Sequence, residues 1–114
     1  PALSTIACGE FGKVDIRVGT IVEAEDFPRA RKPLYRLLID FGSELGIRQS
    51  AAGLPGRYDL DDLVGRQVIA VLNMGVRNIA GFESQCLTLG LPDEEGETIL
   101  LAPTRPVPNG GRLF

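Results

Sequence analysis

Short apolar stretches, each ended by glycine or proline, are the feature that most limits what this chain of 114 residues can fold into. It contains 14 Gly and 8 Pro, which break helices and punctuate turns. Between them, apolar and polar residues alternate with the period of half-buried β-strands. With 44% hydrophobic and 24% charged residues, the composition is that of a folded globular domain. We therefore predict a single all-β domain.

The first predicted strand, 14–24, places its even-numbered residues on one apolar face, and Gly19 is the expected point of a bend that lets the strand serve both halves of a small barrel. Glycine, proline and acidic turn residues separate the strands that follow. These further strands are predicted at 35–41, 47–51, 67–73, 83–91 and 98–102.

The connections contain one predicted helix. Residues 58–65 favour one or two helical turns, with Asp59 as the cap and Gly65 as the terminator. Residues 26–33 and 74–82 are expected to be loops, and 93–97 a solvated acidic turn. The order of elements predicts a small closed OB-fold barrel of five to six strands, with the helix between strands three and four, a core at about 14–102 and terminal extensions. The Pro-rich tail, 103–114, is still apolar at Val107, Leu113 and Phe114, and we expect it to dock on a surface.

Several function classes are excluded by composition. The chain has no His, so serine and cysteine nucleophiles paired with an imidazole base are ruled out. Cys8 and Cys86 match no metal or redox spacing. We predict no catalytic residues, no metal site and no cofactor. The cysteine usage and the lack of an export or membrane segment favour a cytoplasmic protein.

A series of short motifs resembles the tRNA-binding domain family. The resemblance covers about 15–91 and extends, for one free-standing bacterial type described as a secretion chaperone, through the tail. The motifs that carry it are Asp15-Ile-Arg-Val-Gly19, Pro28 and Ala30, Gln49-Ser50, Leu63-Val-Gly65, 68–73, 77–85, Glu25-Asp-Phe-Pro-Arg-Ala-Arg, Leu38-Ile-Asp-Phe-Gly42, Ile79-Ala-Gly-Phe82 and Pro106-Val-Pro-Asn-Gly110.

The resemblance implies an OB-fold homodimer whose terminal segments, including the tail at 103–114, help to form the interface. It also implies affinity for tRNA and for unfolded or precursor polypeptides. Synthetase-type members commonly carry Lys-Pro where this chain has Gly75-Val76, and a basic residue where it has Ala80. Two cationic positions of the family are therefore missing here.

The sequence indicates two candidate binding surfaces, and for each there is an alternative in which the residues have only a structural or solvated role. The tRNA candidates are Arg17, Lys32, Arg48, Asn73, Arg77, Ser84 and Gln85. A basic loop brings four cations within eight residues, and with Arg17, Arg48 or Arg77 these can meet a phosphate backbone. Alternatively, the loop is solvated and balanced by Glu23, Glu25 and Asp26. The four cations are Arg29, Arg31, Lys32 and Arg36. The polar members can read RNA, or Asn73 and Ser84 can satisfy loop backbone groups.

The polypeptide-binding candidates are Met74, Val76, Ile79 and Phe82, four apolar residues in an expected loop. They can form an adaptable binding surface, or they can be buried against the barrel or a second subunit. We predict a non-enzymatic, homodimeric polypeptide-binding chaperone, with a tRNA-binding module acting on tRNA or a synthetase as the alternative.

Overall fold

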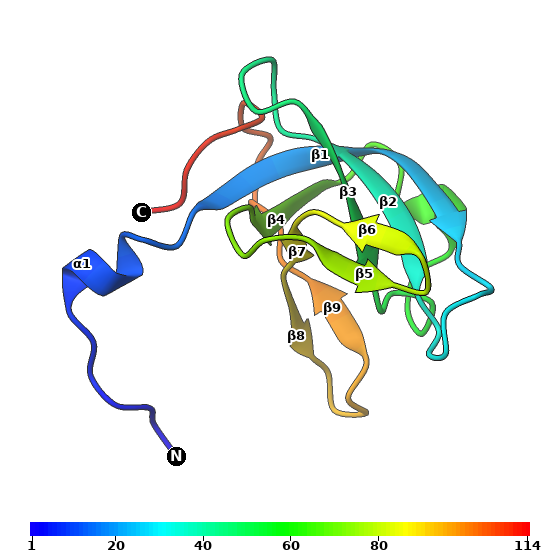
Figure 1. Cartoon of the computed structure of the whole chain (residues 1–114), viewed down its shortest axis with the longest axis horizontal. Helices are drawn as coiled ribbons and strands as arrows, with labels where there is room; N and C mark the ends of the chain where they lie inside the picture. The colour runs from blue at the N-terminus through cyan, green and yellow to red at the C-terminus, as the bar shows by residue number, and fades with distance from the viewer.

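A computed structural model describes all residues, 1–114. Its centre is a five-stranded antiparallel sheet in the order β3-β2-β1-β4-β7, curled into a barrel (Figure 1). These strands are β1 (Ile16–Asp26), β2 (Tyr35–Asp40), β3 (Ile47–Ala52), β4 (Gln67–Val71) and β7 (Leu87–Thr88). The predicted OB-fold class is confirmed.

The long first strand serves both halves of the barrel. It pairs with β2 from Thr20 onward and with β4 up to Thr20. The register shifts between Ile21 and Glu23, so Val22 bulges outward and is 42% exposed. The bulge therefore lies at Val22, three residues beyond the bend predicted at Gly19. The prediction that all even-numbered residues share one buried face fails at Val22, because Ile21 is the fully buried residue there, whereas Ala24 packs against the core again. A bulge inserts one residue and reverses the alternation.

Gly19 has a packing role instead. A Cβ built on it would lie 2.7 Å from Ile39 Cγ2 and 2.7 Å from Phe41 Cδ1. Both neighbours belong to the apolar centre, where Ile21, Leu37, Ile39 and Phe41 are almost fully buried. Only glycine leaves room for these side chains beside the β1 backbone.

The connections hold a single 3-10 turn, η1 (Leu60–Asp62), where one or two helical turns were expected. Asp59 is its N-cap residue, although its side chain makes no capping hydrogen bond. Gly65 has φ +92° and ends the segment as predicted. A short N-terminal helix, α1 (Cys8–Phe11), was not predicted.

The segment after β4 differs most from expectation. Residues predicted as a loop contain a hairpin, β5 (Arg77–Ile79) and β6 (Phe82–Ser84), whose turn residues Ala80 and Gly81 have φ +49° and +86°. The strand predicted at 83–91 is divided into the end of β6, β7 and β8 (Gly90–Pro92). The last strand, β9 (Thr98–Leu100), pairs with β8 across the acidic turn.

The tail docks on the barrel. Residues 110–113 lie along the free edge of β1, with Gly110 N–H donating to Val18 C=O at 2.8 Å and Leu113 N–H to Ile16 C=O at 2.9 Å. Gln67 Nε2 donates to Val107 C=O at 2.7 Å, and Val107 N–H donates back to Gln67 Oε1 at 3.0 Å. The C-terminus and α1 therefore lie on the same side of the barrel, beside the start of β1 (Figure 1).

No helix in the structure has both the length and the apolar character needed to cross a membrane.

Candidate polypeptide and nucleic-acid interface

Two connections meet over the outer face of the barrel. The loop at 27–34 joins β1 to β2, and the β5–β6 hairpin joins β4 to β7. Phe27 from the loop and Phe82 from the hairpin pack edge to face, with ring centroids 5.5 Å apart. Arg36 of β2 stacks its guanidinium 5.3 Å from the centre of the Phe27 ring. This aromatic contact sets the position of both connections relative to the sheet.

The predicted cations fall into two groups. Arg17 is engaged within the chain, because its Nε lies 2.6 Å from Asp15 Oδ1 and its Nη1 donates to Gly110 C=O at 2.9 Å. Arg48 is half-buried and donates to Leu72 C=O at 3.3 Å. The side chains of Lys32 and Arg77 are exposed and have no partner in an ion pair. Among the predicted tRNA-binding cations, these two are available to a ligand.

The proposed neutralisation of the basic loop by ion pairs with nearby carboxylates is largely absent. Of the cations in this region, only Arg36 pairs with an acid, Glu25, at 3.4 Å. Arg29, Arg31 and Lys32 have no carboxylate within ion-pair distance. The loop at 27–34 therefore presents three unneutralised positive charges.

The predicted polar residues are bonded to the chain itself. Asn73 donates from Nδ2 to Lys13 C=O at 2.7 Å, and its Oδ1 accepts from Asp15 N–H at 2.9 Å. Buried Ser84 accepts from Ala51 N–H at 3.1 Å, and Gln85 Oε1 accepts from Gln49 N–H at 2.9 Å. These groups satisfy backbone atoms, as the alternative interpretation expected, and Ser84 and Gln85 help to close the barrel.

The four apolar candidates do not behave alike. Met74 is 64% exposed and Val76 is 59% exposed, so neither is buried against the barrel, which was one of the alternatives. Ile79 and Phe82 are half-buried. The structure brings Met74, Arg77 and Ser84 together around a cavity of about 60 Å3 that Cys86 also lines. Lys32 and Arg17 do not line it.

Sequence reasoning did not predict that a set of residues on the outer face of the sheet gathers at one cleft. A cleft of about 290 Å3 lies on the sheet beside Phe82, and its rim carries two carboxylates. The alternation of β1 was the available signal, but the bulge at Val22 obscured it. The residues concerned are Glu23, Glu25, Arg36, Leu38 and Gln49. Of the two carboxylates at this cleft, Glu25 is paired with Arg36, whereas Glu23 has no ion-pair partner.

The buried thiol has no nucleophilic character. Burial raises the pKa of Cys86 to about 11, and this outweighs the opposing effects of the Ser50 hydrogen bond and the Arg48 charge. A protonated thiol is a poor nucleophile and metal ligand. No group of three or more His, Cys, Asp or Glu side chains is placed to hold a metal ion.

Comparison with known proteins agrees with this architecture. The family described as "Putative tRNA binding domain" matches residues 16–112. The methionine–tRNA ligase of Methanococcus maripaludis is 41% identical over 103 residues, which are 90% of this chain but only 15% of that enzyme. This chain therefore corresponds to a small part of that ligase.

Two solved structures match over their whole length. The chaperone CsaA of Bacillus anthracis has a TM-score of 0.91 and 42% identity, covering 97% of this chain and 100% of that one. The CsaA chaperone of Picrophilus torridus has a TM-score of 0.89 and 38% identity, covering 96% and 100%. The resemblance found in the sequence is confirmed.

Proposed function

Since this chain belongs to the tRNA-binding domain family and is CsaA-like in structure, we propose that it is a non-enzymatic chaperone that binds unfolded or precursor polypeptides in the cytoplasm. The observation that carries this is the exposure of Met74 and Val76 on the connection after β4. The end-to-end correspondence with two structures named as CsaA chaperones supports it.

Met74 and Val76 are suited to a polypeptide ligand because both are apolar and exposed to water. Apolar side chains held in water gain free energy when another apolar surface covers them. Met74 is unbranched and can repack around different side chains. Asn73, next in the chain, is anchored to Lys13 and Asp15. The patch is therefore presented from a fixed base, with Gly75 at φ +77° shaping the turn between Met74 and Val76.

We further propose that the protein acts as a homodimer through its terminal segments. Phe11, Val14, Leu113 and Phe114 line a cleft of about 390 Å3 between the N-terminal segment and the tail. Phe114 is fully exposed in the single chain, and Phe11 and Leu113 are 45% and 43% exposed. A second copy that covered these side chains would remove them from water. Light scattering at micromolar concentration should give the dimer mass, and the monomer mass would contradict the proposal.

The chaperone function is tested by protection of a chemically denatured client from aggregation. The variant Met74→Asp/Val76→Asp should lose most of the protection, because it places charge on the proposed contact surface. Val64→Asp is the matched control, since Val64 is 54% exposed and follows η1. Equal protection by parent and double variant, with both folded by circular dichroism, would contradict the proposal.

A second candidate function, tRNA binding, is favoured by the free cations Lys32 and Arg77 together with the unneutralised loop at 27–34. We propose that these cations and Arg48 contact phosphate, while Arg17, Asn73, Ser84 and Gln85 position the surrounding backbone. Filter binding with tRNA should then show an affinity that falls steeply with salt. Arg77→Gln should reduce the log-log salt slope by about one unit, whereas Arg105→Gln, in the tail, should not.

A further inference from the structure

We propose that the seam where β3 meets β7 and β8 is a binding groove for an extended polypeptide segment that carries apolar and basic residues. This deepens the proposed chaperone function and rests on it. The proposal places an ordered, strand-like ligand at a site separate from the exposed patch at Met74 and Val76.

The barrel is not closed by a strand ladder at this seam. β3 has no β-ladder partner other than β2. The seam is held by Ser50 Oγ and Thr88 Oγ1, 2.9 Å apart, by Ala51 N–H donating to Ser84 Oγ, and by the backbone bond from Gln85 N–H to Gln49 C=O at 2.8 Å. At this seam, hydrogen bonds that involve side chains therefore make most of the connections between the strands, whereas backbone hydrogen bonds connect them elsewhere in the barrel.

Backbone groups of β3 are left available beyond those contacts. In the β2–β3 register, Phe41 N–H donates to Gly46 C=O. By alternation, the backbone N–H and C=O groups of residues 48, 50 and 52 point toward β2, and those of residues 49, 51 and 53 point toward the seam. Ala51 C=O and Gly53 N–H consequently point away from β2, and neither has a partner in the chain. An edge of this kind can accept another strand.

On the opposite wall of the seam, formed by β7 and β8, some backbone groups also have no strand partner. Leu89 N–H donates to Ile69 C=O at 2.8 Å, and Leu89 C=O accepts from Leu101 N–H at 3.2 Å. By alternation, the backbone groups of Thr88 and Gly90 face away from β4 and β9. An extended chain can satisfy such groups with its own amides, whereas a nucleic acid lacks that regular backbone spacing.

A groove of about 360 Å3 occupies this seam, and half of its lining residues are apolar. Leu54 forms its buried base, and Leu91 of β8 is 59% exposed at its side. The groove shares Ala51 and Leu87 with the small cavity lined by Met74 and Arg77, so the two adjoin. Alternate side chains of a bound strand would face this apolar lining.

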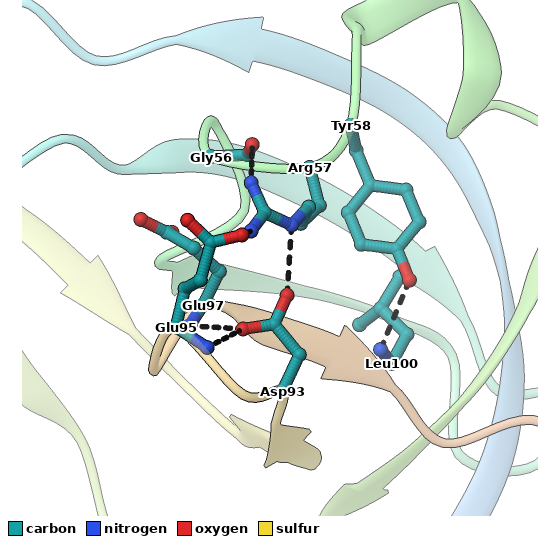
Figure 2. A network of polar contacts seen from close by, with 7 residues as sticks. All are labelled: Gly56, Arg57, Tyr58, Asp93, Glu95, Glu97 and Leu100. Atoms are coloured by element: carbon teal, nitrogen blue, oxygen red, sulfur yellow. Dashed lines mark hydrogen bonds and ion pairs between the residues drawn. The ribbon is translucent and has the colours of Figure 1, made fainter.

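The charge at one end of the groove specifies the ligand further. Gly96 and Thr98 of the β8–β9 hairpin line the groove, and the turn between these strands carries four carboxylates. Figure 2 shows Arg57 reaching across to Asp93 at 2.8 Å and to Glu95 at 3.0 Å. Glu94 and Glu97 have no ion-pair partner. The unneutralised negative charge complements lysine or arginine in the ligand.

The test uses fluorescence anisotropy with a short labelled peptide of alternating valine and threonine that ends in two lysines. The parent protein should bind it saturably. A peptide with glutamates in place of lysines, and one with N-methyl groups on alternate amides, should each bind about tenfold more weakly or worse. Equal affinity for all three peptides would overturn the proposal.

Two pairs of protein variants locate the site. Glu94→Lys/Glu97→Lys should weaken binding of the lysine peptide about tenfold, whereas Glu44→Lys/Asp61→Lys changes the net charge equally at other places and should not. Gly53→Pro removes the seam N–H and should weaken binding. Gly53→Ala keeps this N–H, and its Cβ would have only ordinary contacts, the nearest at 3.9 Å. Thermal unfolding checks that each variant is folded.

The outcomes separate this proposal from the broader one. If Met74→Asp/Val76→Asp abolishes peptide binding while the seam variants bind normally, the site is the exposed patch and the seam proposal fails alone. If Leu91→Asp changes the oligomeric mass and peptide affinity stays unchanged, a second copy covers the groove, and again only the seam proposal fails. If neither peptide nor denatured client is bound by the parent, the chaperone function itself fails.

Discussion

Phe27 and Phe82 touch edge to face, with ring centroids 5.5 Å apart and planes inclined by 63°, although 55 positions separate them in the chain (82 − 27). Their contact fastens the basic loop to the hairpin that follows the exposed apolar patch. A charge at Phe82 would therefore disturb both candidate interfaces at once. For this reason the exposed residues Met74 and Val76 are the sharper probes of ligand binding.

The aromatic contact itself can be measured. Phe82→Leu keeps an apolar side chain but removes the edge-to-face geometry, which contributes about 0.5–1.5 kcal/mol beyond burial. We expect urea unfolding to show a loss of stability of this order. Amide hydrogen exchange should also become faster in the loop at 27–34. Unchanged exchange there would mean that the ring contact does not hold the loop.

Gly19 offers a test of packing at the centre of the barrel. Gly19→Ala forces a methyl group to within 2.7 Å of Ile39 Cγ2 and Phe41 Cδ1, and overpacking of this kind costs about 1–3 kcal/mol. The matched control is Gly9→Ala, because a Cβ at Gly9 meets nothing within 4 Å. A lowered urea midpoint in Gly19→Ala alone is expected. A urea midpoint equal to that of the parent would show that the core accommodates the added methyl group without loss of stability.

The Arg57–Asp93 pair predicts a dependence of stability on pH. Desolvation opposes the ionised form of Asp93, but the hydrogen bond from Arg57, the backbone N–H groups of Glu97 and Glu95 and the Arg57 charge prevail and lower its pKa. A carboxylate with a lowered pKa stabilises the fold above its ordinary pKa of about 3.9, and this contribution is lost as the pH falls through the lowered value.

The corresponding variant is Asp93→Asn. Its urea midpoint should lie below that of the parent at neutral pH, and the difference should narrow at strongly acidic pH, where Asp93 of the parent is also protonated. A difference that stays constant over this range would show that the carboxylate charge does not contribute.

The two-way bond between Gln67 and Val107 predicts how the tail is held. Gln67→Ala removes both hydrogen bonds to Val107 and the bond from Gln67 Nε2 to Asn109 Oδ1. Limited proteolysis with a protease of broad specificity should then cut the tail sooner than in the parent, while the barrel stays intact. If the proposed dimer uses the tail, the dimer should also dissociate at higher protein concentration. An unchanged rate of cleavage would mean that the edge bonds to β1 suffice.

The local sequence pattern determined a large part of the fold of this protein. The strand predicted at 35–41 is confirmed, and its alternate residues Leu37, Ile39 and Phe41 are buried in the core, because alternate side chains of a strand point to the same face. Glycine and proline correctly marked the ends of β2 and β3, and the order of elements identified the OB-fold. The motifs at 15–91 indicated the family, which the comparisons confirmed.

Tertiary structure decided the rest, because contacts between distant segments do not leave a periodic signal. The extra residue at Val22 became outward-facing only because β1 must pair with β2 and β4 in different registers. Asn73, Ser84 and Gln85 have the chemistry of RNA ligands, but their partners Lys13, Ala51 and Gln49 lie 60, 33 and 36 positions away in the chain. Burial and hydrogen bonding depend on such partners, so the sequence named the candidate residues while the fold determined which of them remain free to bind.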